Sequence, residues 1–113
     1  MDDVDVPQVA VSELPSAFGG SNVLLDVREP DEWLRGHAPE ATHVPMGEVP
    51  GRVADLDTDA EYFVVCHGGG RSQRVAEYLV RNGYRAVNVS GGMLAWVAAG
   101  RPVITDGGDQ GSV

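Results

Sequence analysis

The chain has 113 residues, a length that predicts one domain able to bury a core of its own. Its formal net charge is -9, which argues against partners such as nucleic acid or an acidic membrane surface. One cysteine permits no internal disulfide, and the sequence has neither an apolar signal segment nor a run of membrane-spanning length, so we expect a soluble, cytoplasmic protein.

The N-terminal part predicts two short strands on either side of a helical turn. Residues 1–5 are acidic, and we expect them to be flexible. Residues 8–11 predict a strand, and Ser12 predicts the N-cap of a short helix that runs to Phe18. After a turn, residues 23–27 predict the next strand.

Charged residues follow this second strand. Asp26 and Arg28 at its end are either catalytic or a structural ion pair, and we favour the structural interpretation. Pro30 suits the first position of a helix, and this predicted helix ends near Gly36.

The middle of the chain predicts a strand, a helix and a second strand. Residues 42–45 predict a short extended edge, and residues 47–56 predict a helix that is interrupted or begins near Pro50. Residues 62–65 are aromatic or β-branched, as expected of a central strand with both faces covered.

The most informative stretch follows this strand. It holds Cys66, three glycines and an Arg-Ser pair, and from Ser72 the apolar residues recur with the period of a helix that Gly83 ends. A glycine loop on a helix N-terminus presents free N–H groups and the positive end of the helix dipole to an anion. We therefore predict an anion-binding loop made of His67, Gly68, Gly69, Gly70, Arg71 and Ser72.

Cys66 lies at the edge of this loop, and a thiolate is an anion that the loop can stabilise. We therefore predict that Cys66 is a nucleophile, against the alternative that it is an inert buried cysteine. Arg71 adds a planar cation suited to an oxyanion of the substrate or leaving group. All eight basic residues are arginines, which excludes a P-loop lysine, and the glycines do not fit G-x-G-x-x-G.

His37 and His43 are the alternative candidates for a general base. A single histidine is more often a hydrogen-bonded structural residue, and an activated thiolate needs no base. The three histidines and the cysteine lack zinc-type spacing, so we expect no metal and no cofactor.

The C-terminal part predicts a strand over residues 84–89 and a helix over residues 93–99. Trp33 and Trp96 lie among apolar residues, and we expect them in the core. Residues 105–113 are rich in Gly and Asp, and we expect a flexible tail. Strands that alternate with helices predict an α/β domain with a mainly parallel sheet, whose ligand binds at the carboxyl ends of the strands.

Three segments resemble the signatures of single-domain rhodaneses, which are sulfurtransferases. They are residues 24–33 with Gly36-His37, the loop of residues 66–72, and residues 91–96 with 99–103. The resemblance implies a three-layer rhodanese-like domain over residues 6–104, with a mainly parallel central sheet flanked by helices and a persulfide-forming Cys66. It also implies a small anionic sulfur donor such as thiosulfate and an acceptor that is cyanide or a thiol, with a protein as a further option for either partner.

Other activities remain as alternatives. Four residues separate Cys66 from Arg71, as in rhodaneses that handle sulfur, whereas the related phosphatases and arsenate reductases carry one residue more. We rank these enzymes below a non-catalytic or sulfur-carrying module that acts with a protein partner. His67 stands where many relatives have Arg, so its imidazole predicts that donor binding weakens as the pH rises through its pKa.

Overall fold

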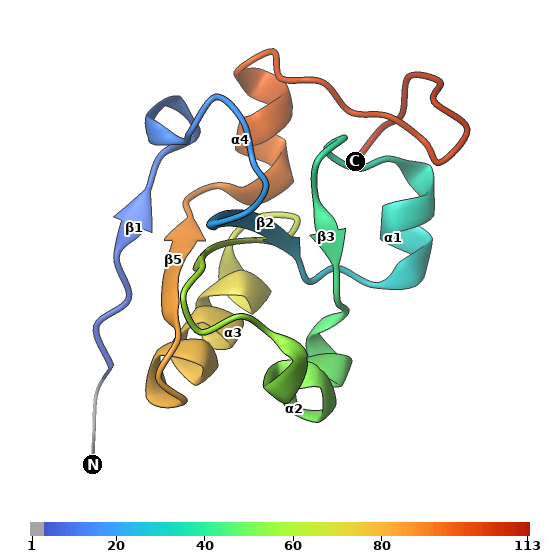
Figure 1. Ribbon diagram of the computed structural model, residues 1–113. Coiled ribbons are helices and arrows are strands. Elements are labelled where there is room, and N and C mark those ends of the chain that lie inside the picture. The colour runs from blue at the N-terminus through green and yellow to red at the C-terminus, as the bar shows by residue number, and fades with distance from the viewer. Residues whose placement is uncertain (1–3) are drawn as a thin grey trace.

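A computed structural model describes residues 4–113 and contains a five-stranded sheet (Figure 1). The strand order is β1-β5-β4-β2-β3, and every neighbouring pair is parallel, which confirms the predicted α/β class. The strands are β1 (Gln8–Val9), β2 (Asn22–Asp26), β3 (Thr42–His43), β4 (Glu61–Val65) and β5 (Arg85–Val89).

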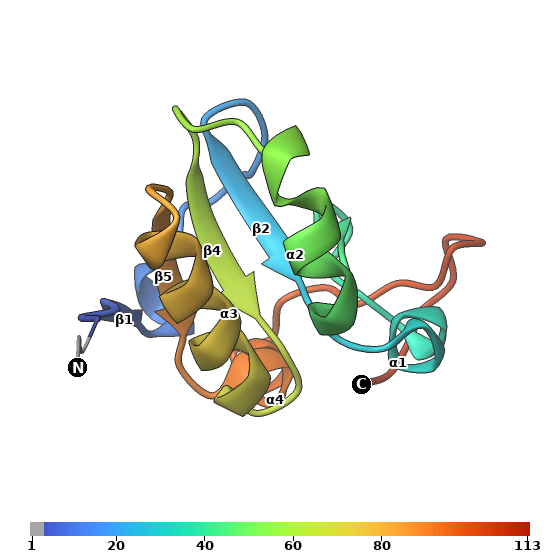
Figure 2. The same ribbon diagram turned by 90° about the horizontal axis from the view of Figure 1, so that it is seen from below.

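Helices cover both faces of the sheet. The α-helices are α1 (Pro30–Arg35), α2 (Val49–Arg52), α3 (Gly70–Arg81) and α4 (Gly92–Ala98). Figure 2 shows α2 and α3 over one face, and α4 contributes Met93 and Trp96 to the core on the other face. None of the helices in residues 4–113 is long and apolar enough to cross a membrane.

Strand β4 lies in the middle of the sheet, and this position explains why its sequence is almost continuously apolar. Tyr62 and Val64 enter the core beside α2 and α3, whereas Phe63 and Val65 enter the core beside α4. Because successive side chains of a strand point to opposite faces, a strand covered on both sides needs apolar residues at every position. This placement also fixes the point where the chain leaves the sheet, directly before Cys66.

Two predicted helices are shorter than expected. The helix expected from Ser12 to Phe18 is a 3-10 turn over Val11–Glu13, because Leu14 precedes Pro15 and adopts an extended conformation with ψ 152°. Residues 47–56 form α2 between two 3-10 turns, Met46–Glu48 and Val53–Asp55.

The tail of residues 105–113 is hydrogen bonded to the domain, where the sequence predicts flexibility. Ile104 exchanges two backbone hydrogen bonds with His37, of 2.8 and 2.9 Å, and the Ser112 N–H donates to the Arg35 carbonyl at 2.9 Å. Glycine makes this possible, since a Cβ on Gly36 would lie 2.5 Å from the Ser112 carbonyl oxygen. The flexibility expected at the N-terminus falls mostly on residues 1–3, which lie outside the described residues.

A buried ion pair joins the end of β2 to α1. Asp26 and Arg28 are both fully buried, with 2.7 Å between Oδ2 and Nη2, and the same Nη2 donates to the Gly36 carbonyl at 2.8 Å. This is the structural role favoured from the sequence. Because Gly36 ends α1, the pair fixes that helix against the sheet.

We predict that Arg28→Met lowers the free energy of unfolding by about 3–5 kcal/mol, because it leaves the Asp26 carboxylate buried without its cation. Urea unfolding measures the loss. Arg35→Met is the matched control: its exposed pair with Asp31, at 3.8 Å, is expected to contribute less than about 1 kcal/mol. Equal losses in the two variants would contradict the structural role of the buried pair.

Candidate active site

Cys66 occupies the first position after β4, where the chain leaves the sheet for the loop that leads into α3. In parallel sheets, ligands bind at the carboxyl ends of the strands, and the loop of residues 66–70 lies at that end. Cys66 is 1% exposed, so its sulfur is surrounded by the loop and its neighbours.

Several hydrogen-bond donors surround the sulfur. The Gly69 N–H lies 3.1 Å and the Ser72 Oγ 3.3 Å from the Cys66 Sγ. Burial raises the pKa of the thiol, but hydrogen bonds from the Ser72 hydroxyl and from the backbone N–H groups of Ser72, Gly69 and Arg71 together hold the pKa of Cys66 below its ordinary value. Gly69 has φ +116°, a conformation that glycine adopts readily.

Ser72 is itself held by a residue that the sequence analysis did not single out. Its Oγ lies 2.6 Å from the Oδ1 of Asn88, and the Nδ2 of Asn88 donates to the Gln8 Oε1 at 2.8 Å. A serine hydroxyl has one proton, so Ser72 divides its donation between the amide of Asn88 and the sulfur of Cys66. A polar residue inside the apolar strand β5 was the available signal, since buried polar groups need partners.

The N-terminus of α4 holds the loop from the other side. The Met93 N–H donates to the Cys66 carbonyl at 2.8 Å, and the Leu94 N–H donates to the His67 carbonyl at 3.1 Å. This approach requires glycine, because a Cβ on Gly92 would lie 2.4 Å from the Cys66 carbonyl oxygen. Gly92 therefore allows the N-terminus of α4 to hold the loop in position.

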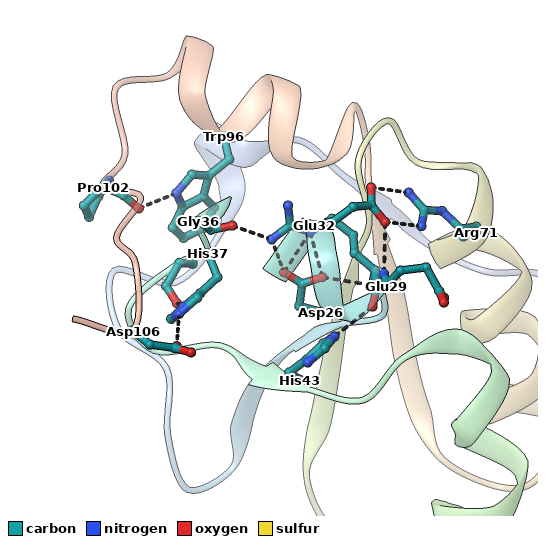
Figure 3. Close-up of polar contacts among 12 residues, drawn as sticks. Asp26, Glu29, Glu32, Gly36, His37, His43, Arg71, Trp96, Pro102 and Asp106 are labelled. Carbon is teal, nitrogen blue, oxygen red and sulfur yellow. Dashed lines mark hydrogen bonds and ion pairs between the residues drawn. The ribbon is translucent and has the colours of Figure 1, made fainter. Parts of the chain in front are cut away.

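Arg71 forms a bidentate ion pair with Glu32 of α1, which Figure 3 shows facing it. The two N–O distances are 2.6 and 3.0 Å. The hydrogen bond with Arg71 lowers the pKa of Glu32 to about 2, and the same contact raises the pKa of Arg71. Glu32 was not among the predicted site residues, because 39 residues separate it from Arg71.

The other predicted loop residues differ in their exposure to solvent. His67 and Gly69 are half-buried, while Gly68 and Gly70 are exposed, and Gly70 begins α3. The loop therefore opens to solvent on one side while Cys66 and Ser72 lie inside.

The two alternative histidines are engaged elsewhere (Figure 3). His37 stacks on Trp33 at 3.6 Å between ring centroids and contacts the Asp106 carboxylate at 2.9 Å. His43 stacks on the same indole and lies 2.8 Å from the Arg28 carbonyl oxygen. These contacts support structural roles. Within residues 4–113, no group of three or more His, Cys, Asp or Glu side chains is arranged to hold a metal ion.

Comparisons with known proteins identify relatives of the chain. The family described as Rhodanese-like domain matches residues 10–99. The chain is 44% identical over 79 residues to the "Putative sulfurtransferase YtwF" of Bacillus subtilis, a match that covers 70% of this chain and 77% of that protein.

Two further relatives extend the comparison. The "Putative sulfur carrier protein YrkF" of Bacillus subtilis is 39% identical over 94 residues, which is 80% of this chain and about half (51%) of that protein. The crystal structure of a rhodanese-like domain protein from Staphylococcus aureus superposes with a TM-score of 0.74 at 32% identity, over 95% of this chain and 100% of that one.

We predict that Ser72→Ala raises the pKa of Cys66, because the thiolate loses a hydroxyl donor. The rate of alkylation by iodoacetamide as a function of pH gives the thiol pKa. Ser90→Ala is the control, since Ser90 is exposed and its hydroxyl contacts Gln8. An unchanged pKa in Ser72→Ala would show that the backbone N–H groups alone stabilise the thiolate.

We also predict that Gly92→Ala displaces the loop. Its matched control is Gly100→Ala, because both glycines have positive φ, of +57° and +79°, but a Cβ on Gly100 meets nothing within 4 Å. The steric conflict is expected to cost Gly92→Ala about 1–3 kcal/mol more than the control and to lower thiol reactivity. Urea unfolding and iodoacetamide alkylation measure both effects, and equal behaviour of the variants would contradict the role of Gly92.

Proposed function

This chain belongs to the rhodanese-like domain family, and we propose that it is a sulfurtransferase that works through a persulfide on Cys66. It moves a sulfane sulfur from a donor such as thiosulfate to a thiophilic acceptor, either cyanide or a cellular thiol. The observation that carries this proposal is the set of hydrogen-bond donors around the Cys66 sulfur, which includes the Gly69 N–H and the Ser72 hydroxyl.

The first step loads the cysteine. The Cys66 thiolate attacks the outer sulfur of the donor, so that a new S–S bond forms while the S–S bond of the donor breaks. With thiosulfate, the leaving group is sulfite, which takes the electron pair of the broken bond. The charge is conserved, since a thiolate and a dianion become a persulfide anion and a dianion.

The second step unloads it. The acceptor attacks the outer sulfur of the persulfide, and the electron pair of the S–S bond returns to Cys66 as a thiolate. Between the steps, the backbone N–H groups of residues 67–72 and the positive end of α3 stabilise the persulfide anion. A reduced thiol is needed for each cycle, which agrees with a cytoplasmic setting.

A sulfur carrier is the second candidate function. The chain matches about half of a relative that is named as a putative sulfur carrier protein. In such a role, this chain would exchange sulfur with a protein partner instead of turning over small molecules. The same Cys66 persulfide serves this role. The two functions therefore differ in the donor and acceptor, while the chemistry at the cysteine is shared.

We predict that incubation with thiosulfate adds one sulfur atom to the intact protein, measured by mass spectrometry. Cyanide or dithiothreitol is expected to remove the added sulfur. Cys66→Ser is the control and is expected to gain none, because the hydroxyl is not ionised at neutral pH.

Loading of Cys66→Ser equal to that of wild type would contradict the proposal. Slow thiosulfate loading together with fast loading from a protein persulfide would favour the carrier function. Failure of wild type to load from either donor, combined with hydrolysis of an aryl phosphate that depends on Cys66, would replace the proposal by a phosphatase activity.

A further inference from the structure

The Glu32–Arg71 pair places a fixed negative charge next to the reactive loop. Both oxygens of Glu32 accept from the Arg71 guanidinium, at 2.6 and 3.0 Å, and Oε1 also accepts from the Glu29 N–H at 2.9 Å. The carboxylate is therefore held at two ends, by α1 on one side and by the loop arginine on the other (Figure 3).

The helix that carries Glu32 is itself fixed. Arg28, buried with Asp26, donates to the Gly36 carbonyl at the end of α1, and the Ser112 N–H of the tail donates to the Arg35 carbonyl. With its pKa lowered to about 2, Glu32 remains ionised at neutral pH. The negative charge beside the loop is thus permanent in both position and sign.

This charge cancels the cation that an oxyanion needs. Arg71 is close enough to the loop for the Cys66 thiolate to raise its pKa, but the stronger effect on the same guanidinium comes from Glu32. Arg28 is neutralised in the same way by Asp26. A substrate that approaches Cys66 therefore meets an arginine whose charge is already balanced and a carboxylate that repels anions.

The consequence differs between donors. Thiosulfate is a dianion whose negative charge extends over three oxygens. A neutralised arginine and a nearby carboxylate therefore weaken its binding more than that of a less charged donor. A persulfide, R–S–SH or its anion, carries at most one negative charge on sulfur and has no sulfonate group that requires a cation. Backbone N–H groups of the loop suffice for the sulfur atoms.

We propose that Glu32 is a specificity-determining residue that disfavours dianionic oxyanion donors and directs Cys66 toward persulfide donors. The inference rests on the proposed sulfur transfer and deepens it by naming the donor class. With a persulfide donor, the Cys66 thiolate attacks the outer sulfur, which passes to Cys66 with its proton. The donor thiolate then leaves with the electron pair of the broken S–S bond.

The experiment measures the second-order rate constant for loading sulfur onto Cys66, by rapid quenching and intact mass spectrometry. The donors are thiosulfate, the monoanion methanethiosulfonate and glutathione persulfide. The test variant is Glu32→Gln, which keeps the shape of the side chain and an acceptor for the Glu29 N–H. The matched control is Asp31→Asn, which removes the same charge from the neighbouring position of α1, where the side chain is 76% exposed.

We expect Glu32→Gln to load from thiosulfate about tenfold faster than wild type, because one repulsive charge is gone and Arg71 is released. The gain is expected to be smaller with methanethiosulfonate and less than about twofold with the persulfide. Asp31→Asn is expected to change thiosulfate loading by less than about twofold, since exposed charges are screened. Glu32→Asp keeps the charge and is expected to stay within about threefold of wild type.

A double variant tests whether the effect passes through Arg71. In the background of Arg71→Met, we expect Glu32→Gln to lose most of its gain with thiosulfate, which is the coupling that a double-mutant cycle measures. Persulfide loading at the wild-type rate shows that a variant is folded.

Four results would overturn the inference. Slower thiosulfate loading in Glu32→Gln would show that Glu32 orients Arg71 for oxyanions instead. An equal gain with all three donors would show that Glu32 acts on Cys66 itself, independent of donor charge. Absence of loading from every donor in wild type would overturn the proposed sulfur transfer as well, whereas normal wild-type loading without a donor-dependent change in Glu32→Gln would overturn the inference alone.

Discussion

The hydrogen bonds to the Cys66 sulfur are the interaction on which the rest of the site depends. A buried cysteine is normally an inert thiol, because burial disfavours the charged thiolate. Here the Gly69 N–H, the Ser72 hydroxyl and the adjoining backbone N–H groups outweigh that penalty and lower the pKa of Cys66. In the proposed mechanism, the same donors also stabilise a persulfide on Cys66, whose charge lies one atom further out.

The surrounding elements keep these donors in place. The N-terminus of α4 holds the loop carbonyls of Cys66 and His67, which requires a glycine at position 92. Asn88 of β5 holds the Ser72 hydroxyl. Each contact comes from a different element at the carboxyl end of the sheet, which explains why a short loop with three glycines has a defined geometry.

Two ion pairs balance the charge of arginines at this end of the sheet. Arg28, just beyond the end of β2, and Arg71, in the loop, are each paired with a carboxylate, and the loop amides and the α3 dipole add positive potential. This pairing of charges is the basis of the donor preference proposed for Glu32.

The sequence by itself determined the features that depend on neighbouring residues. An apolar strand, a cysteine, three glycines and a helical period place Cys66 at the N-terminus of a helix, because these signals lie within one short stretch of chain. The parallel sheet followed from the alternation of strands and helices. Pro15 was a local signal too, because a residue before proline favours an extended conformation, but the helix predicted from Ser12 to Phe18 did not take it into account.

Only the tertiary structure decided the contacts between segments far apart in the chain. Glu32 meets Arg71 across 39 residues, and Asn88 meets Ser72 across 16, so the local pattern shows neither pairing, although a polar residue within β5 signals that Asn88 needs a partner. The tail of residues 105–113 has the composition of a flexible segment, yet it pairs with the backbone near Gly36, since two glycines there allow the chains to approach. Composition reports how freely a segment moves when alone, whereas its hydrogen-bond partners exist only after the sheet has brought them together.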